Sequence, residues 1–414
     1  MIERFFVRPR IIRRFHDGPL GEYVDGLAER LWDRGYVRST ARGKLLVVEE
    51  LGWWLHRQGL GVDALDEDTT ERFLREGRRL GFGHLAYGRV ALRDLLTVLR
   101  EIGTIPPAPA TEIEDAPIER IERDFKRYLI QERRLTESTL KNIIPSVRRL
   151  LTERFGTGPV ALGELTRSDV TRFVLRHVQL LSPARAQVMV YALRTLFRFL
   201  RLRGDIAVDL SVSVPKVAVW QLSALPKSLG ADEVERLLES CDQATVVGQR
   251  DYTILLLLAR LGLRAGEVVA MTLDDIDWES GRLRVRGKGN RDDWFPIPED
   301  VGKALAHYLR HGRPRCTTRR VFIRIRAPRR EFSSSVAICD VVRRALSRAH
   351  IDSPRKGAHL LRHSLACEML RKGASMDEIG EVLRHQRADT TAIYAKVDVA
   401  ALRGLARLWP GGEA

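Results

Sequence analysis

A proline-rich segment divides this chain and limits how it can fold. Residues 103–117 (GTIPPAPATEIEDAP) hold four prolines in fifteen residues. Proline lacks a backbone N–H and has a fixed φ, so such a run favours a semi-rigid linker over a helix or a central strand. A second connection, rich in Val, Ser and Pro, covers residues 211–227. The 414 residues therefore divide into three blocks, 1–102, 118–210 and 228–414.

The first two blocks carry apolar residues at helical spacing and are predicted to be helical. They also parallel each other, because Thr40 aligns with Thr139 and Phe73 with Phe173, and the offset stays at 99 to 101 residues throughout. We interpret this as a duplicated helical module of about 100 residues. The alternative is that any two four-helix modules look alike at this level.

The third block has a mixed pattern. Two short alternating stretches, GRLRVRGKG and RDDWFPIP, are joined by residues 287–290 and predict a β-hairpin. A long apolar helix is predicted before them, at Asp251 to Leu261, and further helices after them. The expected fold class is therefore mainly α, with a small antiparallel β-sheet in the last block.

The charge balance predicts a polyanionic partner. The chain has 70 Lys and Arg against 54 Asp and Glu, and residues 281–330 alone hold 15 basic and 4 acidic residues. Nucleic acid or an anionic membrane is the usual partner of such a chain. The longest apolar run is six residues, Ile254 to Ala259, against the roughly 20 that a membrane span needs. Four scattered cysteines and the lack of a secretory signal favour a reducing cytoplasm.

Several short motifs of the third block could carry chemistry, although each is weak alone. His359 and His363 lie on one helical face, as zinc ligands can, but Leu360 stands where the metalloprotease motif requires glutamate. We therefore expect no metal site and no cofactor. The candidate catalytic residues are Arg264 in LGLRAGE, Lys288 in the hairpin turn, His359 and Arg362 in HLLRH, His385 in LRHQRADTT and Tyr394 in AIYAK.

In this order and spacing the motifs resemble the tyrosine recombinase (phage integrase) family. GLRAGEV resembles the family's first-arginine box with Glu267 as its acidic residue, RGKGNRDDWFPIP its hairpin with the catalytic lysine, and HLLRHSLA its His-x-x-Arg-His box. LRHQRADTTAIYAKVD resembles the final box, with nine residues from His385 to Tyr394. The middle block resembles the core-binding helical domain. One departure is Arg384, which stands where the family usually has glycine.

The resemblance implies a helical DNA-clamp module in the middle block, a mixed α/β catalytic domain and a site-specific DNA recombinase. The first block goes beyond the minimal architecture of the family, and the internal repeat predicts that it is a second helical DNA-clamp module. Such an enzyme cleaves and rejoins DNA through a covalent 3′-phosphotyrosine, without metal or ATP. Tyr394 would be the nucleophile, His359 the base, and Lys288 the acid for the leaving 5′-oxygen. We expect nearby cations to lower the pKa of Tyr394. The implied role is integration, excision or transposition of a mobile element.

The resemblance also implies partners and DNA contacts. Double-stranded recombination sites, a homotetramer on DNA and accessory or sister recombinases are expected, in the cytoplasm near the nucleoid. The tail, residues 395–414, carries an apolar stripe that would link protomers or fold back on its own domain. The first block would be a second DNA-contacting module or, through Trp53 and Trp54, a dimerisation or regulatory cap. The predicted DNA-binding residues are Arg38, Arg42, Lys44, Arg286 and Arg291.

Four other functions remain open at this point. A metal-dependent transposase would need separated carboxylates, and Asp274, Asp275 and Asp277 form the tight acidic cluster. A type IB topoisomerase shares the Arg, Lys, His and Tyr chemistry. A catalytically inactive DNA-binding regulator and a helical scaffold are the remaining alternatives.

Overall fold

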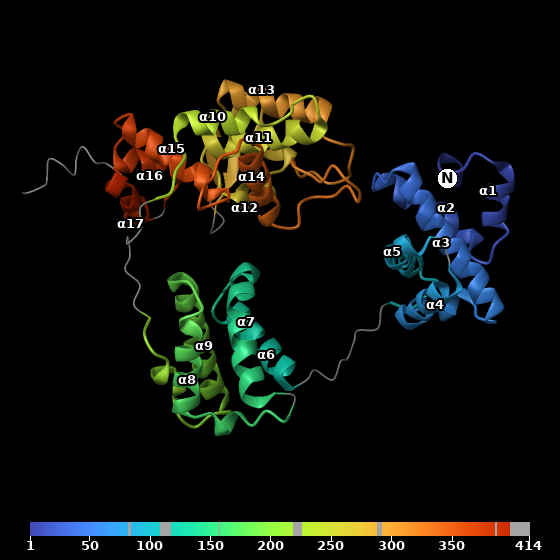
Figure 1. The fold of residues 1–414 in the computed structure, drawn as a ribbon, viewed down its shortest axis with the longest axis horizontal. Helices are drawn as coiled ribbons and strands as arrows, with labels where there is room; N and C mark the ends of the chain where they lie inside the picture. Colours follow the sequence, from blue (N-terminus) through green and yellow to red (C-terminus); the bar gives the residue numbers. More distant parts are fainter. Residues whose placement is uncertain are drawn as a thin grey trace, which may run out of the picture. The chain divides into compact units, whose positions relative to one another are not determined.

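The fold is known from a computed structural model (Figure 1), which is mostly helical. It describes residues 1–81, 84–107, 117–156, 158–217, 226–287, 292–385 and 387–397. No helix in these ranges is long and apolar enough to cross a membrane. Residue contacts divide the chain into two compact units, one formed by Ala108–Ser223 and the other by Met1–Pro107 with Ala224–Ala414.

The first block is a helical bundle with its own apolar core. Phe5, Phe73 and Leu95 are fully buried in it. The predicted helical character is therefore confirmed. Its helices are α1 (Pro9–His16), α2 (Gly21–Asp33), α3 (Arg38–Arg57), α4 (Glu67–Leu80) and α5 (Gly88–Glu101).

The middle block packs four helices around a second core. Pro117 is the first residue of its first helix, which therefore begins at the last residue of the predicted linker, 103–117. Proline suits this position because the first helical N–H has no partner within the helix. Ser211 and Val214 are buried, so the packed unit also continues past residue 210. The helices are α6 (Pro117–Gln131), α7 (Glu137–Phe155), α8 (Arg167–Val178) and α9 (Pro183–Arg203).

The two helical blocks share part of their order of elements, since α3, η2 (Val62–Ala64) and α4 in the first correspond to α7, η4 (Leu162–Glu164) and α8 in the second. The short 3-10 helices η2 and η4 lie one hundred residues apart. The next helix in each block is capped by a side chain, Asp66 or Thr166, that accepts the backbone N–H three residues later. These corresponding elements begin 99 or 100 residues apart, whereas α5 and α9 begin 95 residues apart, so the duplication stays a prediction.

The apolar helix α11 (Val246–Arg260) lies in the core of the third block; it confirms the helix predicted at Asp251 to Leu261 but begins five residues earlier. Its residues Ile254 to Leu258 are at most 1% exposed. A separate small core joins α15 and α16 and includes Leu383 and Tyr394. The other helices are α10 (Ala231–Glu239), α12 (Ala265–Ala270), α13 (Glu299–His307), α14 (Val336–Arg348), α15 (His359–Arg371), α16 (Met376–Leu383), α17 (Ala388–Thr391) and the 3-10 helix η8 (Ala392–Val397).

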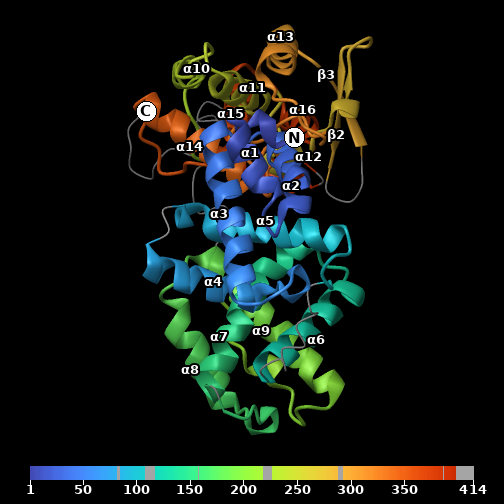
Figure 2. The same cartoon turned by 90° about the vertical axis from the view of Figure 1, so that its right-hand side faces the viewer.

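The third block also holds a three-stranded antiparallel sheet in the order β1–β2–β3. The strands are β1 (Ile276–Asp277), β2 (Arg282–Arg286) and β3 (Asp292–Pro296). Leu283 pairs with Phe295 across the hairpin that Figure 2 shows beside the helices. This confirms the predicted hairpin and fold class. The turn that carries Lys288 and Arg291 lies outside the described residues.

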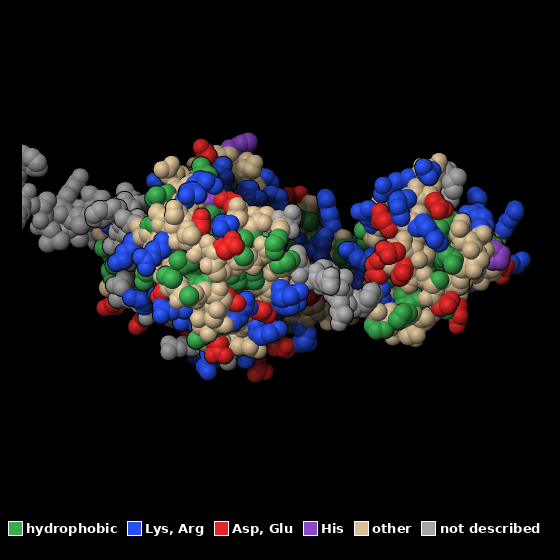
Figure 3. All heavy atoms as spheres, turned by 90° about the horizontal axis from the view of Figure 1, so that it is seen from below, with side chains coloured by type: hydrophobic (Ala, Val, Ile, Leu, Met, Phe, Trp, Pro, Cys, Tyr) green, Lys and Arg blue, Asp and Glu red, His purple; other side chains and the backbone are tan. Residues whose placement is uncertain are grey.

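Basic side chains are spread over the face of the molecule in Figure 3, with acidic side chains among them. The net formal charge of the chain is +16. A surface of this kind attracts polyanions over a distance of about a Debye length.

Candidate active site

Arg264 is held in place by a buried carboxylate at the start of α12. The Arg264 backbone N–H donates to Glu267 Oε2 (2.7 Å), and its Nη1 donates to Glu267 Oε1 (2.9 Å). The Glu267 side chain is 6% exposed, whereas that of Arg264 is 37% exposed. Glu267 therefore fixes the base of the arginine, while part of the guanidinium remains accessible to a ligand.

Arg362 lies on the first turn of α15 and is almost fully buried. Its guanidinium donates to the carbonyl oxygen of Gly262 (2.5 Å) and to that of Leu383. Burial and the nearby cations Arg264 and Arg384 lower its pKa to about 10. The group still carries its charge at neutral pH, so the site holds a fixed, desolvated positive charge.

His385 follows the end of α16 and packs against the tyrosine. Its Nδ1 shares a 2.8 Å hydrogen bond with Thr391 Oγ1. Its ring is parallel to the Tyr394 ring, with centroids 6.4 Å apart. Burial and the charges of Arg362 and Arg264 lower the pKa of His385 to about 4, so it is neutral at pH 7 and available as a hydrogen-bonding group.

Tyr394, on η8, is 1% exposed. Its hydroxyl lies 2.8 Å from Nδ1 of His363 on α15. Burial raises the pKa of Tyr394 to about 12, although the charge of Arg362 acts to lower it. The expected lowering of this pKa is therefore wrong for the free protein, because loss of solvent outweighs the nearby cation.

His363, rather than the expected base His359, contacts the tyrosine hydroxyl. Burial and the neighbouring His359 lower the pKa of His363 to about 4. A neutral imidazole beside a phenol can accept its proton. His363 was visible in the sequence as the second histidine of HLLRH, but its spacing gave no means of choosing it over His359.

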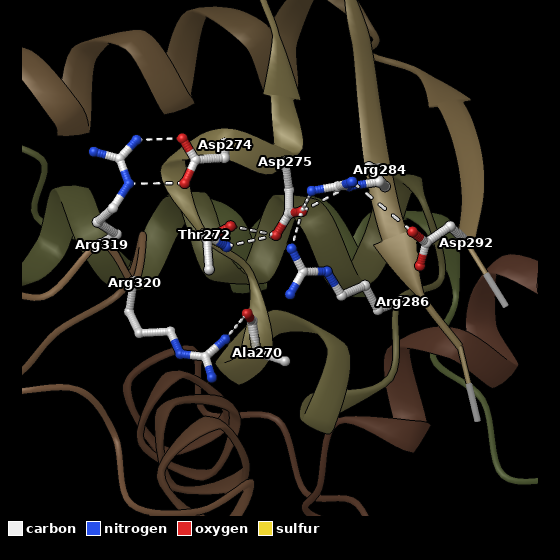
Figure 4. Close-up of polar contacts among 9 residues, drawn as sticks. All are labelled: Ala270, Thr272, Asp274, Asp275, Arg284, Arg286, Asp292, Arg319 and Arg320. Atoms are coloured by element: carbon white, nitrogen blue, oxygen red, sulfur yellow. Dashed lines mark hydrogen bonds and ion pairs between the residues drawn. The ribbon is translucent and has the colours of Figure 1, made fainter. Parts of the chain in front are cut away.

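The predicted DNA-binding residue Arg286 lies at the end of β2 and is half-exposed. Its Nη2 is 3.0 Å from the buried Oδ1 of Asp275, which also accepts from Arg284 (Figure 4). Asp275 further accepts hydrogen bonds from Thr272. This carboxylate therefore ties the hairpin to the segment after α12. Lys288 and Arg291, the other two residues predicted in this hairpin, lie outside the described residues.

The acidic cluster considered for metal binding pairs with basic and hydroxyl groups instead. Asp274 forms an ion pair with Arg319 (Figure 4), and Asp277 accepts from Ser280. In the described part of the chain, no group of three or more His, Cys, Asp or Glu side chains is arranged to hold a metal.

Of the three predicted DNA contacts in the first block, one is contradicted. The Lys44 side chain is 3% exposed, with its ammonium 2.7 Å from Asp94 Oδ2. A buried and paired ammonium is not available to a phosphate. Arg38 and Arg42 both donate to the Phe5 carbonyl oxygen, at 2.9 and 2.6 Å, and only Arg38 is exposed.

Comparison with known proteins identifies relatives along nearly the whole chain. The profile of the phage integrase family matches residues 227–400. The putative integrase/recombinase y4rA of Sinorhizobium fredii is 45% identical over 396 residues, which are 95% of this chain and 96% of the relative. The putative integrase/recombinase y4rF of the same organism is 30% identical over 423 residues, covering 100% of this chain and 97% of the relative.

Solved structures share the fold. The XerH site-specific recombinase bound to its palindromic difH substrate superimposes with a TM-score of 0.55 at 19% identity. The match covers 70% of this chain and 85% of that chain.

Proposed function

Because the chain belongs to the phage integrase family and is a tyrosine recombinase that cleaves and rejoins DNA, we propose that Tyr394 is its nucleophile. The observation that carries this proposal is the hydrogen bond between the Tyr394 hydroxyl and His363, which lies on the same helix as Arg362. A phenol, a neutral base and a fixed cation are the groups that transfer of a phosphoryl group to tyrosine requires.

The reaction exchanges one phosphodiester for another. The Tyr394 oxygen attacks the scissile phosphorus and loses its proton to a histidine, for which His363 has the observed contact. Arg264 and Arg362 stabilise the charge that develops on the non-bridging oxygens. The bond to the 5′-oxygen breaks, and Lys288, assigned by resemblance, supplies the proton to this leaving group. A free 5′-hydroxyl then attacks the phosphotyrosine in the reverse sense, so no nucleotide is consumed.

The buried position of Tyr394 adds a requirement. At 1% exposure, the side chain has to be uncovered before its oxygen can reach a DNA phosphate. Part of η8 or its surroundings must therefore move when the protein engages its substrate.

A nicked suicide substrate tests the assignment. Wild-type protein should become trapped on the 3′ side of the break, and Tyr394→Phe should bind the same DNA with unchanged affinity and form no adduct. Tyr252→Phe, which also removes a partly buried phenol oxygen, is the matched control and should form the adduct. An adduct with Tyr394→Phe would reject Tyr394 as the nucleophile.

We assign the assembly and setting by resemblance. Four protomers would act on two duplexes of double-stranded DNA, with accessory or sister recombinases possible, in the cytoplasm at the nucleoid. The biological role would be integration, excision or transposition of a mobile element. The tail, residues 395–414, would link protomers, and most of it lies outside the described residues. Deletion after Asp398 should then spare single-site binding and abolish paired-site complexes on native gels.

The first block is proposed as a second DNA-contacting module. The correspondence of α3 and α4 with α7 and α8 supports this, as does the exposed Arg38 at the start of α3. Removal of residues 1–112 should shorten the footprint and flatten the dependence of log K on log salt, by about 1 for each phosphate that the shortened protein no longer neutralises. An unchanged footprint with altered oligomerisation would instead favour the dimerisation or regulatory cap.

A further inference from the structure

Arg384 occupies a backbone position that suits glycine. It caps the C-terminus of α16 with φ 53° and ψ 52°, in the left-handed region. Glycine adopts this conformation without steric cost, whereas a residue with a Cβ does not. Some interaction of the arginine side chain must therefore offset the strain, because the turn itself gains nothing from it.

The Arg384 side chain is directed inward, to the carboxylate that holds Arg264. It is 9% exposed, and its Nη2 lies 2.7 Å from Oε2 of Glu267. Its guanidinium also packs over the ring of Phe295 on β3, 4.8 Å from the ring centroid. Arg384 therefore joins the end of α16 to α12 and to the strand that follows the turn with Lys288.

Glu267 is shared between two arginines. Its Oε1 accepts from Nη1 of Arg264, and its Oε2 accepts from the Arg264 backbone and from Arg384. With Arg362, the cluster contains three guanidinium groups and one carboxylate, which leaves a net formal charge of +2. A pentacoordinate phosphate in the transition state carries a charge of −2.

Two nitrogens of the Arg384 guanidinium, Nε and Nη1, are buried and have no hydrogen-bond partner among the described residues. A buried guanidinium with unpaired donors is costly to retain. Its field is also weakly screened in this low-dielectric surrounding, and Arg384 is one of the cations that lower the pKa values of Arg362 and His385.

We propose that Arg384 is a positioning residue for DNA cleavage. It orients the Glu267 carboxylate that holds Arg264 and adds its own positive charge beside Arg264 and Arg362. This inference rests on the proposed function of Arg264 and Tyr394. We assign Arg384 to positioning because its guanidinium is buried and paired with Glu267, the carboxylate that also holds Arg264.

Arg384→Gly in the full-length protein tests this role, because glycine suits the backbone and the variant should fold. Single-turnover cleavage of a nicked substrate should fall at least ~10-fold, less than the ~10²–10³ expected for a direct transition-state contact. DNA affinity should change by less than about twofold, because many other cations hold the backbone. The melting temperature should be unchanged or higher. Arg384→Lys should restore part of the rate, and Arg384→Gln should not.

Arg343→Gln is the matched control, because it removes an exposed arginine that pairs with Asp340 on α14, and it should leave cleavage unchanged. Two further measurements separate positioning from simple support of the fold. The effects of Arg384→Gly and Glu267→Gln should be non-additive, since both act on Arg264. With an uncharged methylphosphonate at the scissile position, Arg384→Gly should also lower the cleavage rate by a smaller factor, because less negative charge develops in the transition state.

An Arg384→Gly protein that cleaves like wild type would overturn the inference, as would additive effects or equal losses of binding and cleavage. A loss of melting temperature in both Arg384→Gly and Arg384→Lys would show that the residue only supports the fold. The proposed function fails separately, through adduct formation by Tyr394→Phe.

Discussion

Replacement of His363 by Gln should make DNA cleavage dependent on high pH. In the free protein the pKa of Tyr394 is raised to about 12, so only about one phenol in 10⁵ is ionised there at pH 7 without a base. The pKa of His363 is lowered to about 4. Its neutral, proton-accepting form is therefore present at every pH above about 5, and it is lost only as the pH falls toward 4.

The wild-type cleavage rate should consequently be nearly flat between pH 6 and 9. A general base contributes typically 10²–10⁴-fold, so His363→Gln should slow cleavage at pH 7 by about that amount. The remaining rate should rise roughly tenfold per pH unit up to pH 9, since the phenol then has to ionise on its own. Single-turnover trapping on a nicked substrate over a pH series measures both quantities, with binding and melting temperature followed in parallel.

His359→Gln is the matched control, since it removes a histidine from the same helix face, one turn away. It should lower the rate without introducing the pH slope. A His363→Gln protein with the wild-type rate, or with an equally slow rate at every pH, would refute the role of His363. If the cleavage rate rises with pH only in His359→Gln, then His359 is the base, as the sequence analysis expected.

Three further outcomes are expected. Arg362→Ala should lower the cleavage rate at least ~10²-fold. It should also lower the free energy of unfolding by about 1–3 kcal/mol, because two buried carbonyls lose their donor. Arg264→Ala should lower the cleavage rate with little change in melting temperature, and equal losses of affinity and cleavage would make both arginines ordinary phosphate contacts. The folded-state pKa values of His363 and His385 are depressed to about 4, so the stability that these neutral histidines contribute is present above pH 6.5 and is lost as the pH falls toward 4. The melting temperature should therefore be lower at pH 5 than at pH 7.5. A variant with both histidines replaced by Gln that loses as much stability in acid would argue against this explanation. Cleavage should be unchanged in EDTA, and a strict Mg²⁺ requirement would reject the mechanism.

The sequence by itself identified the candidate groups of the site. They lie in short motifs, so resemblance to tyrosine recombinases was enough to select Arg264, Arg362, His385 and Tyr394 before any fold was known. The hairpin and the helical blocks were also predictable, because alternating and helical periodicity are local properties of the chain.

The tertiary structure decided which groups meet and what burial does to them. His363 and His359 are equivalent in sequence, and only the packing of η8 against α15 places His363 on the hydroxyl. Likewise, Lys44 is a cation in any sequence analysis, but Asp94 lies beside it only after α3 packs against α5. The pKa of Tyr394 depends on the balance between lost solvent and a neighbouring charge, and both are set by contacts between residues far apart in the chain. Arg384 was a departure without a role until folding brought it to Glu267, 117 residues away.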